Sequence, residues 1–361
     1  MMKNKALYIH VPFCEHICYY CDFCHLIYNQ KFARQWLDAL KVEKEKRLDF
    51  EPYTIYIGGG TPVSLDEELL EELLILFYPY SGNKEYTVEV NPESLTLNKA
   101  KLLKKYGVNR ISIGLESSNE EELKSLGRKH NYKDVKEACG MLKEVGIDNI
   151  NLDILYSFPN QTMDSFKQTI EDAYKLNPNH LSLYSLTIED NTVFGQKKVQ
   201  TFDDEKEAIF YEYAVKSFKE HGYHQYEVAN FAKKGEESKH NQVYWHYEDF
   251  LGLSMGASSK LANIRSDNTR SLKKYLAQEY IAEEIILDKE DMMFEMVMMN
   301  LRLEEGLLKE RFYKAFDVDI LDVYKEAIDA GVKKDWLEID DKYLRCKNRE
   351  ILNSVLLLFM K

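Results

Sequence analysis

The chain has 361 residues, of which 45% are hydrophobic and 30% charged, so it can form one large and one small domain around a sizeable core. Its formal net charge of −13 argues against nucleic-acid binding, and no apolar run is long enough to span a bilayer. The start of the sequence lacks a hydrophobic signal core, and six cysteines are typical of a reducing compartment, so we expect a cytoplasmic location.

Short apolar runs alternate with amphipathic segments through the first 220 residues. We expect six strands, at residues 7–11, 53–57, 86–90, 110–115, 150–155 and 181–186. The expected helices are 31–50, one from 66 onward, 98–106, 120–126, 132–145, 164–176 and 203–221. This order predicts parallel strands, but roughly 190 residues are fewer than the about 250 of a complete eight-fold barrel. We therefore predict an α/β fold, an incomplete (β/α)6 barrel with its chemistry at the carboxyl ends of the strands.

The alternation stops beyond about Tyr223. We expect residues 1–230 to form the barrel and residues 231–270 to connect it to a smaller, mostly helical domain of winged-helix-like shape at 271–361. A buried helix at 292–301 and a short wing at 336–345 are expected in that domain. No basic face emerges there, so DNA binding is not predicted.

Three cysteines follow the first predicted strand with the spacing C-x3-C-x2-C, at Cys14, Cys18 and Cys21. Three thiolates in a tight loop suit a 4Fe–4S cluster with one open iron better than zinc, which takes four ligands in its structural sites. Two other interpretations stay open: a structural zinc site with Cys24 as fourth ligand, and a disulfide or unpaired thiols.

Glycines and carboxylates lie at the ends of the next predicted strands. Gly58-Gly-Gly-Thr-Pro62 allows a ligand to approach the backbone closely, although a structural turn is the alternative. Glu89, Glu116 and Asp153 lie in or at the ends of apolar strands, where an acid is costly unless it is paired or binds a ligand. The alternative for each is a buried carboxylate tied to a loop amide. Arg128 can pair with one of these acids or with a ligand carboxylate.

A second informative segment is Lys239-His-Asn-Gln-Val-Tyr-Trp245, which has no strong helix or strand period. It places the imidazole of His240, the phenol of Tyr244 and the indole of Trp245 within six residues. Imidazole is a frequent axial ligand of heme iron, and aromatic rings stack on porphyrins. A buried, hydrogen-bonded packing histidine is the alternative.

Together these motifs resemble the HemN/HemW group of radical S-adenosylmethionine (SAM) proteins. The group includes the oxygen-independent coproporphyrinogen III oxidases (HemN) and the HemW-type heme chaperones. The resemblance runs nearly end to end and in the group's order, through residues 8–14, the cysteine loop, and residues 58–62, 89–92, 107–114, 126–128, 151–154 and 183–189.

Two features separate the branches of this group. The oxidases carry a cysteine two positions after the third cluster cysteine, and this chain has Phe23 there; the HemW branch carries His-Asn-x-x-Tyr-Trp, which is intact at residues 240–245. The resemblance therefore implies a HemW-like chaperone that delivers heme to acceptor hemoproteins. Two departures are Glu116-Ser-Ser118 in place of Gln-Ser-Phe, which adds a negative charge, and Cys24, which is displaced by one position from the oxidase cysteine.

The resemblance also implies ligands and partners. It assigns a 4Fe–4S cluster to Cys14, Cys18 and Cys21, and heme to His240, Tyr244 and Trp245. The residues implied around SAM are Tyr8, Tyr20, Gly59, Gly60, Thr61, Glu89, Glu116, Arg128 and Asp153. A flavodoxin- or ferredoxin-type electron donor and a homodimer are further expectations. The alternative function is oxidative decarboxylation of coproporphyrinogen III through a 5′-deoxyadenosyl radical, so whether the chain is an enzyme stays open.

Overall fold

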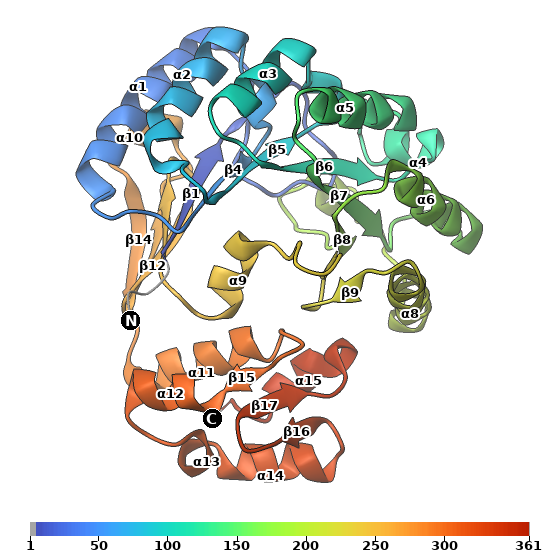
Figure 1. The fold of residues 1–361 in the computed structure, drawn as a ribbon, viewed down its shortest axis with the longest axis vertical. Helices are drawn as coiled ribbons and strands as arrows, with labels where there is room; N and C mark the ends of the chain where they lie inside the picture. The colour runs from blue at the N-terminus through green and yellow to red at the C-terminus, as the bar shows by residue number, and fades with distance from the viewer. Residues whose placement is uncertain (1–4, 361) are drawn as a thin grey trace.

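The computed structural model describes residues 5–360 and is built around one curved, twelve-stranded sheet (Figure 1). The strands follow the order β14-β13-β12-β11-β1-β4-β5-β6-β7-β8-β10-β9, and the run from β11 to β8 is parallel throughout. The six strands expected from the sequence are β1 (Ala6–Val11), β4 (Thr54–Gly59), β5 (Glu85–Val90), β6 (Arg110–Glu116), β7 (Asn149–Tyr156) and β8 (His180–Ser185). The incomplete parallel barrel is confirmed.

Helices cover the outer, convex side of this sheet (Figure 1). They are α1 (Gln30–Arg47), α2 (Glu67–Phe77), α3 (Leu97–Lys105), α4 (Glu120–Ser125), α5 (Tyr132–Glu144), α6 (Met163–Leu176) and α8 (Asp204–Glu220). Each begins after a side chain that accepts a backbone N–H of the first turn, which fixes its start. These residues are Asn29, Asp66, Thr96, Asn119, Asn131, Thr162 and Asp203.

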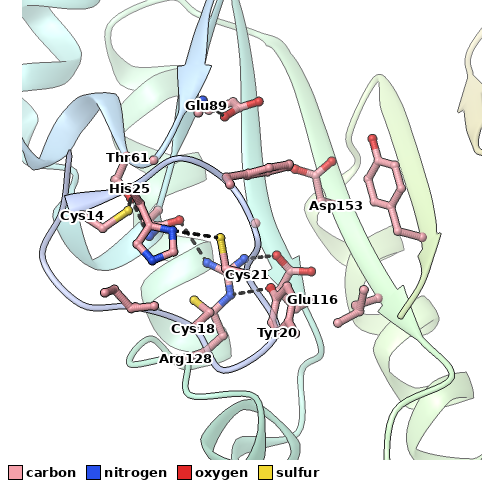
Figure 2. Close-up of a pocket in the computed structure, with 18 of the residues that line it drawn as sticks. Cys14, Cys18, Tyr20, Cys21, His25, Thr61, Glu89, Glu116, Arg128 and Asp153 are labelled. Atoms are coloured by element: carbon pink, nitrogen blue, oxygen red, sulfur yellow. Dashed lines mark hydrogen bonds and ion pairs between the residues drawn. The ribbon is translucent and has the colours of Figure 1, made fainter. Parts of the chain in front are cut away.

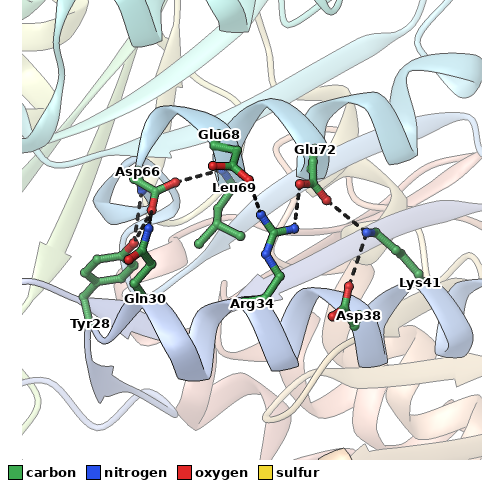
Figure 3. Close-up of polar contacts among 9 residues, drawn as sticks. All are labelled: Tyr28, Gln30, Arg34, Asp38, Lys41, Asp66, Glu68, Leu69 and Glu72. Atoms are coloured by element: carbon green, nitrogen blue, oxygen red, sulfur yellow. Dashed lines mark hydrogen bonds and ion pairs between the residues drawn. The ribbon is translucent and has the colours of Figure 1, made fainter.

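Helices α1 and α2 are joined by a row of ion pairs (Figure 3). Arg34 reaches Glu68 at 2.7 Å and Glu72 at 2.6 Å, and Lys41 also reaches Glu72, at 3.0 Å. The hydroxyl of Tyr28 donates to the capping carboxylate Asp66 at 2.9 Å. Although single surface ion pairs contribute little, this network fixes the segment that leaves the cysteine loop against α2.

The cysteine loop lies between two very short strands, β2 (Phe13–Cys14) and β3 (Leu26–Ile27), which pair in parallel. The remaining short elements of the barrel are the 3-10 turns η1 (Pro62–Ser64), η2 (Tyr78–Tyr80) and η3 (Pro92–Ser94), and α7 (Val193–Gln196). Turns η1 and η3 directly follow β4 and β5, so both lie at the carboxyl edge where chemistry was expected.

The segment expected to connect two domains instead extends the sheet. It contains α9 (Lys239–Trp245), β11 (Phe250–Leu253), β12 (Ser258–Leu261) and β13 (Ile264–Asn268), and it is followed by α10 (Leu272–Leu276) and β14 (Ile281–Ile286). Strand β11 pairs in parallel with β1, and β12 to β14 continue antiparallel. Strands β9 (His224–Gln225) and β10 (Asn230–Ala232) extend the opposite edge. The helical domain therefore begins after Ile286, not at residue 271.

The carboxyl-terminal domain lies below the concave side of the sheet (Figure 1) and has its own hydrophobic core. Its elements are α11 (Lys289–Asn300), β15 (Leu307–Leu308), α12 (Lys309–Phe316), α13 (Ile320–Val323), α14 (Lys325–Lys333), β16 (Leu337–Ile339), β17 (Tyr343–Cys346), η4 (Arg349–Ile351) and α15 (Leu352–Leu356). The hairpin of β16 and β17 lies where the wing was expected. Within residues 5–360, no helix combines the length and the hydropathy needed to cross a membrane.

Candidate cluster and cofactor site

A cavity of about 330 Å³ opens at the carboxyl ends of the parallel strands (Figure 2). Because alternate residues of a strand point to the same face, Tyr56, Glu89, Ser112 and Asp153 face it together from four neighbouring strands. We call this space the first cavity. Polar side chains on the inner face of a parallel sheet are exceptional, since such strands are otherwise buried and apolar.

The three cysteines of the predicted cluster motif all line the first cavity. The hydroxyl of Thr61 donates to the Sγ of Cys14 at 3.6 Å, and the Sγ of Cys21 lies 3.8 Å from Nδ1 of His25 (Figure 2). A Cβ added at Gly60 would lie 3.0 Å from the Sγ of Cys14 and closer still to backbone oxygens, so only glycine fits against the loop. The sequence and the fold thus bring three cysteine thiols to one cavity.

The chemistry of these thiols fits a metal cluster. Burial raises the pKa of Cys14 to about 12 and that of Cys21 to about 11, and it also raises the pKa of Cys18. Ligation requires thiolates, so iron binding here must displace protons. Among residues 5–360, no three His, Cys, Asp or Glu side chains are placed to hold a single ion. Three thiols spread around one cavity suit a multi-iron cluster better than a lone zinc.

Cys24 does not line the first cavity. It is buried beside Gly256, its Sγ lies 3.9 Å from the carbonyl oxygen of Arg270, and it lines a different cavity. All six cysteines are free thiols, so the disulfide alternative is not what the structure shows. The fourth sulfur ligand required by the zinc alternative is therefore missing from the first cavity.

The glycine run holds the carboxylate of Glu89. The N–H of Gly59 donates to Oε2 at 2.9 Å, and the hydroxyl of Tyr56 donates to Oε1 at 2.7 Å. A Cβ at Gly58 would lie 2.7 Å from the carboxyl carbon, and Gly59 has a φ of +107°, so both positions require glycine. Burial raises the pKa of Glu89 to about 7, although the two hydrogen bonds act to lower it. A bound ammonium group would favour the ionised carboxylate.

Arg128 is the cation of the first cavity (Figure 2). Its guanidinium forms an ion pair with Glu116, donates to Asn91 at 3.1 Å and donates to the hydroxyl of Tyr20 at 3.2 Å. Of the two pairings that the sequence allowed, the structure therefore shows the one with an acid. The extra negative charge of Glu116 is compensated by this ion pair, and desolvation raises the pKa of Glu116.

Asp153 is hydrogen-bonded within the protein and also faces the cavity, so it fits both the structural and the ligand-binding interpretation of the strand carboxylates. It accepts hydrogen bonds from Ser112 at 3.0 Å and from Asn151 at 2.8 Å, yet it also lines the first cavity. Desolvation raises its pKa. Sequence reasoning missed several other residues of the wall, namely Tyr56, Asn91, Ser112, Tyr184 and Thr187. Asn91 had a signal, because it lies inside the Glu-Val-Asn-Pro motif; it also donates to Thr61 at 3.0 Å.

Two groups of expected site residues lie elsewhere. Tyr8 does not line the first cavity; its hydroxyl lies 3.0 Å from Nδ1 of His10, and both side chains line a second cavity of about 480 Å³. Tyr244 and Trp245 line this second cavity as well. Their segment, whose sequence has no strong helix or strand period, is the helix α9. The sequence did not predict that the residues expected around SAM and heme would be divided between two cavities.

His240 lies behind Tyr244 and lines neither cavity. Its side chain is 1% exposed, with Nδ1 at 2.9 Å from the hydroxyl of Thr54 and Nε2 at 2.7 Å from that of Tyr244. Burial lowers its pKa to about 3, so the imidazole is neutral. In this conformation both ring nitrogens have protein partners, which is the packing arrangement that the sequence offered as the alternative to heme ligation.

Comparison with known families agrees with this architecture. Residues 8–173 match the family model of the radical SAM superfamily, and residues 287–352 match the model of the HemN C-terminal domain. The fold superposes on coproporphyrinogen III oxidase (HemN) from Escherichia coli with a TM-score of 0.87, covering 99% of this chain and 90% of that one at 23% identity. The fold and the three-cysteine cavity thus define a radical SAM protein with a HemN-type carboxyl-terminal domain.

Relatives that align over most of the chain identify its family within this class. The chain is 37% identical to the heme chaperone HemW of Bacillus subtilis (strain 168), over 86% of this chain and 87% of the relative. It is 35% identical to the heme chaperone HemW of Lactococcus lactis subsp. lactis (strain IL1403), over 100% of this chain and 98% of the relative. The chain belongs to the HemW family of radical SAM proteins.

Proposed function

We propose that this protein is a heme chaperone that holds a 4Fe–4S cluster and SAM and delivers heme to acceptor hemoproteins. The observation that carries the proposal is the similarity, over nearly the whole chain, to relatives named heme chaperone HemW. The three thiols on the wall of the first cavity support it, because they supply the cluster ligands expected of the class.

The residues of the first cavity have distinct proposed roles. Cys14, Cys18 and Cys21 hold the cluster, which supplies one-electron chemistry at the SAM sulfonium when both are bound. Glu89, fixed by two donors, accepts the amino group of SAM. Arg128 keeps Glu116 in place and orients Tyr20 and Asn91, while Gly59, Gly60, Thr61 and Asp153 complete the wall.

Heme binding is proposed for the His-Asn-x-x-Tyr-Trp segment. Tyr244 and Trp245 lie on the wall of the second cavity, whereas Nε2 of His240 is held by the hydroxyl of Tyr244. Ligation of iron by His240 therefore requires that Tyr244 first release this nitrogen. The proposed cytoplasmic location, the flavodoxin- or ferredoxin-type donor and the homodimer rest on the resemblance of the sequence to the HemN/HemW group.

The rival function is that of an oxygen-independent coproporphyrinogen III oxidase. The fold likeness to HemN favours it, but at 23% identity this likeness concerns the architecture alone. Phe23 favours the chaperone, because the oxidase branch carries a cysteine at this position. Its side chain is 59% exposed, so a thiol there would be reachable, but this chain has a phenyl ring instead.

The experiment is anaerobic reconstitution with iron and sulfide, followed by titration with hemin and by transfer to an apo-hemoprotein. We expect a cluster absorption, a separate heme band and transfer of heme to the acceptor. The Cys14→Ser variant should lose the cluster, and the Cys139→Ser variant, which changes a buried cysteine of α5, should keep it. Loss of two carboxyl groups from coproporphyrinogen III, without heme binding, would instead establish the oxidase.

A further inference from the structure

The second cavity is formed where the barrel meets the carboxyl-terminal domain. Its wall comes from β1, α9 and β11 to β13 on the barrel side and from α11 on the other side. Its volume of about 480 Å³ lies in the range of small-molecule sites, and it is partly open to solvent. None of the residues proposed for the cluster lines it.

Flat aromatic side chains make up much of this wall. Tyr244 packs against Phe250 with their ring centroids 4.6 Å apart, and Trp245 lies next to them on α9 with the guanidinium of Arg302 4.5 Å from its ring. Phe23 adds an exposed ring at the boundary with the first cavity. Large aromatic faces favour a flat, apolar ligand, because offset stacking adds to the area buried.

The same wall carries cations. Arg270 is exposed, and its guanidinium donates to the carbonyl oxygen of Asp22; across residues 5–360, no carboxylate forms an ion pair with it. Arg265 pairs with Glu295 at 3.2 Å, and Glu295 also accepts from the hydroxyl of Tyr247 at 2.6 Å. In a chain of net charge −13, an arginine without an acidic partner beside an aromatic cavity indicates an anionic ligand group.

The wall also contains polar atoms that lack partners. The indole nitrogen of Trp245 and Oε2 of Glu248 are buried without a hydrogen-bond partner within the part of the chain that the structure describes. Such atoms are unfavourable unless a ligand or water satisfies them. Aromatic faces, a guanidinium without an acidic partner and an unsatisfied indole donor therefore coincide in one cavity.

We infer that heme binds in this second cavity, with its ring against Tyr244, Trp245 and Phe250 and a propionate on Arg270. This inference rests on the proposed function, since it takes heme as the cargo, and it adds where the cargo lies. Because the cavity is partly open to solvent, part of the ring would stay exposed, which suits a carrier that must release its ligand. Tyr244 separates the cavity from His240, so the ring would lie next to the one side chain that blocks His240 from the iron.

The test uses the full-length, cluster-loaded protein and two probes, hemin and hemin dimethyl ester, which lacks free propionates. The Arg270→Gln variant should bind hemin about tenfold more weakly, since one charge-assisted contact is lost, and should bind the ester as the unmodified protein does. The Ser258→Trp variant, which fills the cavity from β12, should lose both ligands. The Lys101→Gln variant on the distant helix α3 is the matched charge control.

The possible outcomes test the cavity assignment and the chaperone proposal separately. Equal hemin affinity in the unmodified, Arg270→Gln and Ser258→Trp proteins would overturn the cavity assignment and leave the chaperone proposal intact. Absence of hemin binding in the unmodified protein would overturn both. Cluster absorption recorded for every variant shows that the barrel has folded, so a misfolded variant is not counted as a loss of binding.

Discussion

Burial and hydrogen bonding act in opposite directions on the carboxyl group of Glu89. Desolvation raises its pKa to about 7, while the hydroxyl of Tyr56 and the N–H of Gly59 stabilise the ionised form. The side chain therefore changes charge near neutral pH, at the position proposed above for the amino group of SAM. A cation bound there would lower the pKa, so SAM affinity should rise with pH up to about 7.

This shift predicts a pH dependence of stability. Between the unfolded pKa of 4.5 and the folded value of about 7, the native state binds a proton that the unfolded state does not. The free energy of unfolding should therefore decrease as pH rises through this window, by on the order of 2 to 3 kcal/mol without SAM. Urea titrations from pH 4.5 to 7.5 should show a shallower decrease in the Glu89→Gln variant. Parallel curves for the two proteins would contradict the assignment.

At the scale of an element, α9 carries the His-Asn-x-x-Tyr-Trp motif, and both the backbone and the side chain of His240 are held by hydrogen bonds. Glu85 on β5 accepts the N–H groups of Lys239 and His240 at 2.9 and 2.8 Å, which holds the start of the helix against the sheet. The imidazole of His240 then joins Thr54 on β4 to Tyr244. A change at His240 therefore affects packing as well as any iron contact, and a simple loss of heme in a variant would be ambiguous.

Two variants separate these effects. His240→Ala should lower the free energy of unfolding by about 2 to 4 kcal/mol, because it leaves a cavity and two hydroxyls without a partner. Thr54→Val disturbs the same buried network but keeps the imidazole, and should cost about 1 kcal/mol. If His240 ligates heme after release by Tyr244, only His240→Ala should change the position of the heme absorption band. The same band in both variants would rule out His240 as a ligand.

How far the sequence predicts these elements depends on how regular their pattern is. The six parallel strands and their helices have clear apolar periods, and the structure places their ends within a few residues of the expected ones. Strand β14 was not foreseen, because Ile281–Ile286 is an edge strand whose residues are all exposed and show no alternation. Its place in the sheet depends on pairing with β13, which no local signal reveals.

The candidate site, too, was predictable from the sequence only in part. The cysteines and the glycine run are contiguous in sequence, so their convergence on one cavity was predictable. Tyr8 was expected beside SAM but lines the second cavity. Strand β1 lies between β11 and β4, and this pairing, which only the assembled sheet sets, places its tyrosine at the second cavity. The ion pair of Arg128 with Glu116 likewise depended on the fold, since two pairings were compatible with the sequence.

At the scale of the whole molecule, an ion pair between a buried carboxylate and a partly exposed arginine links the two domains. Glu227, whose side chain is fully buried, lies 3.3 Å from Arg302 just beyond α11 and also accepts from Ala229 and Asn230. Arg302 in turn lies over the ring of Trp245. The carboxyl-terminal domain is thus held against α9, the helix that carries the His-Asn-x-x-Tyr-Trp motif.

Replacing only the arginine of this ion pair should lower the free energy of unfolding more than replacing both partners. Arg302→Met leaves the buried carboxylate of Glu227 without its cation and should lower the free energy of unfolding by about 3 kcal/mol, measured by denaturant titration. The double variant Arg302→Met with Glu227→Gln should recover most of this loss, because no buried charge then remains unpaired. Additive effects of the two substitutions would show that the ion pair does not couple the domains. Lys314→Met, an exposed cation of α12, serves as the control.

Asp22 and Phe23 line the first and the second cavity alike. These two residues form a partition between the cavities, so a shift that fits a ligand in one cavity also changes the shape of the other. If cofactor and cargo prefer different positions of this partition, each changes the dissociation constant of the other by the same factor, as reciprocity of binding equilibria requires. Loading at the sulfur-lined side would then set how firmly the porphyrin is retained, with two consecutive residues as the link.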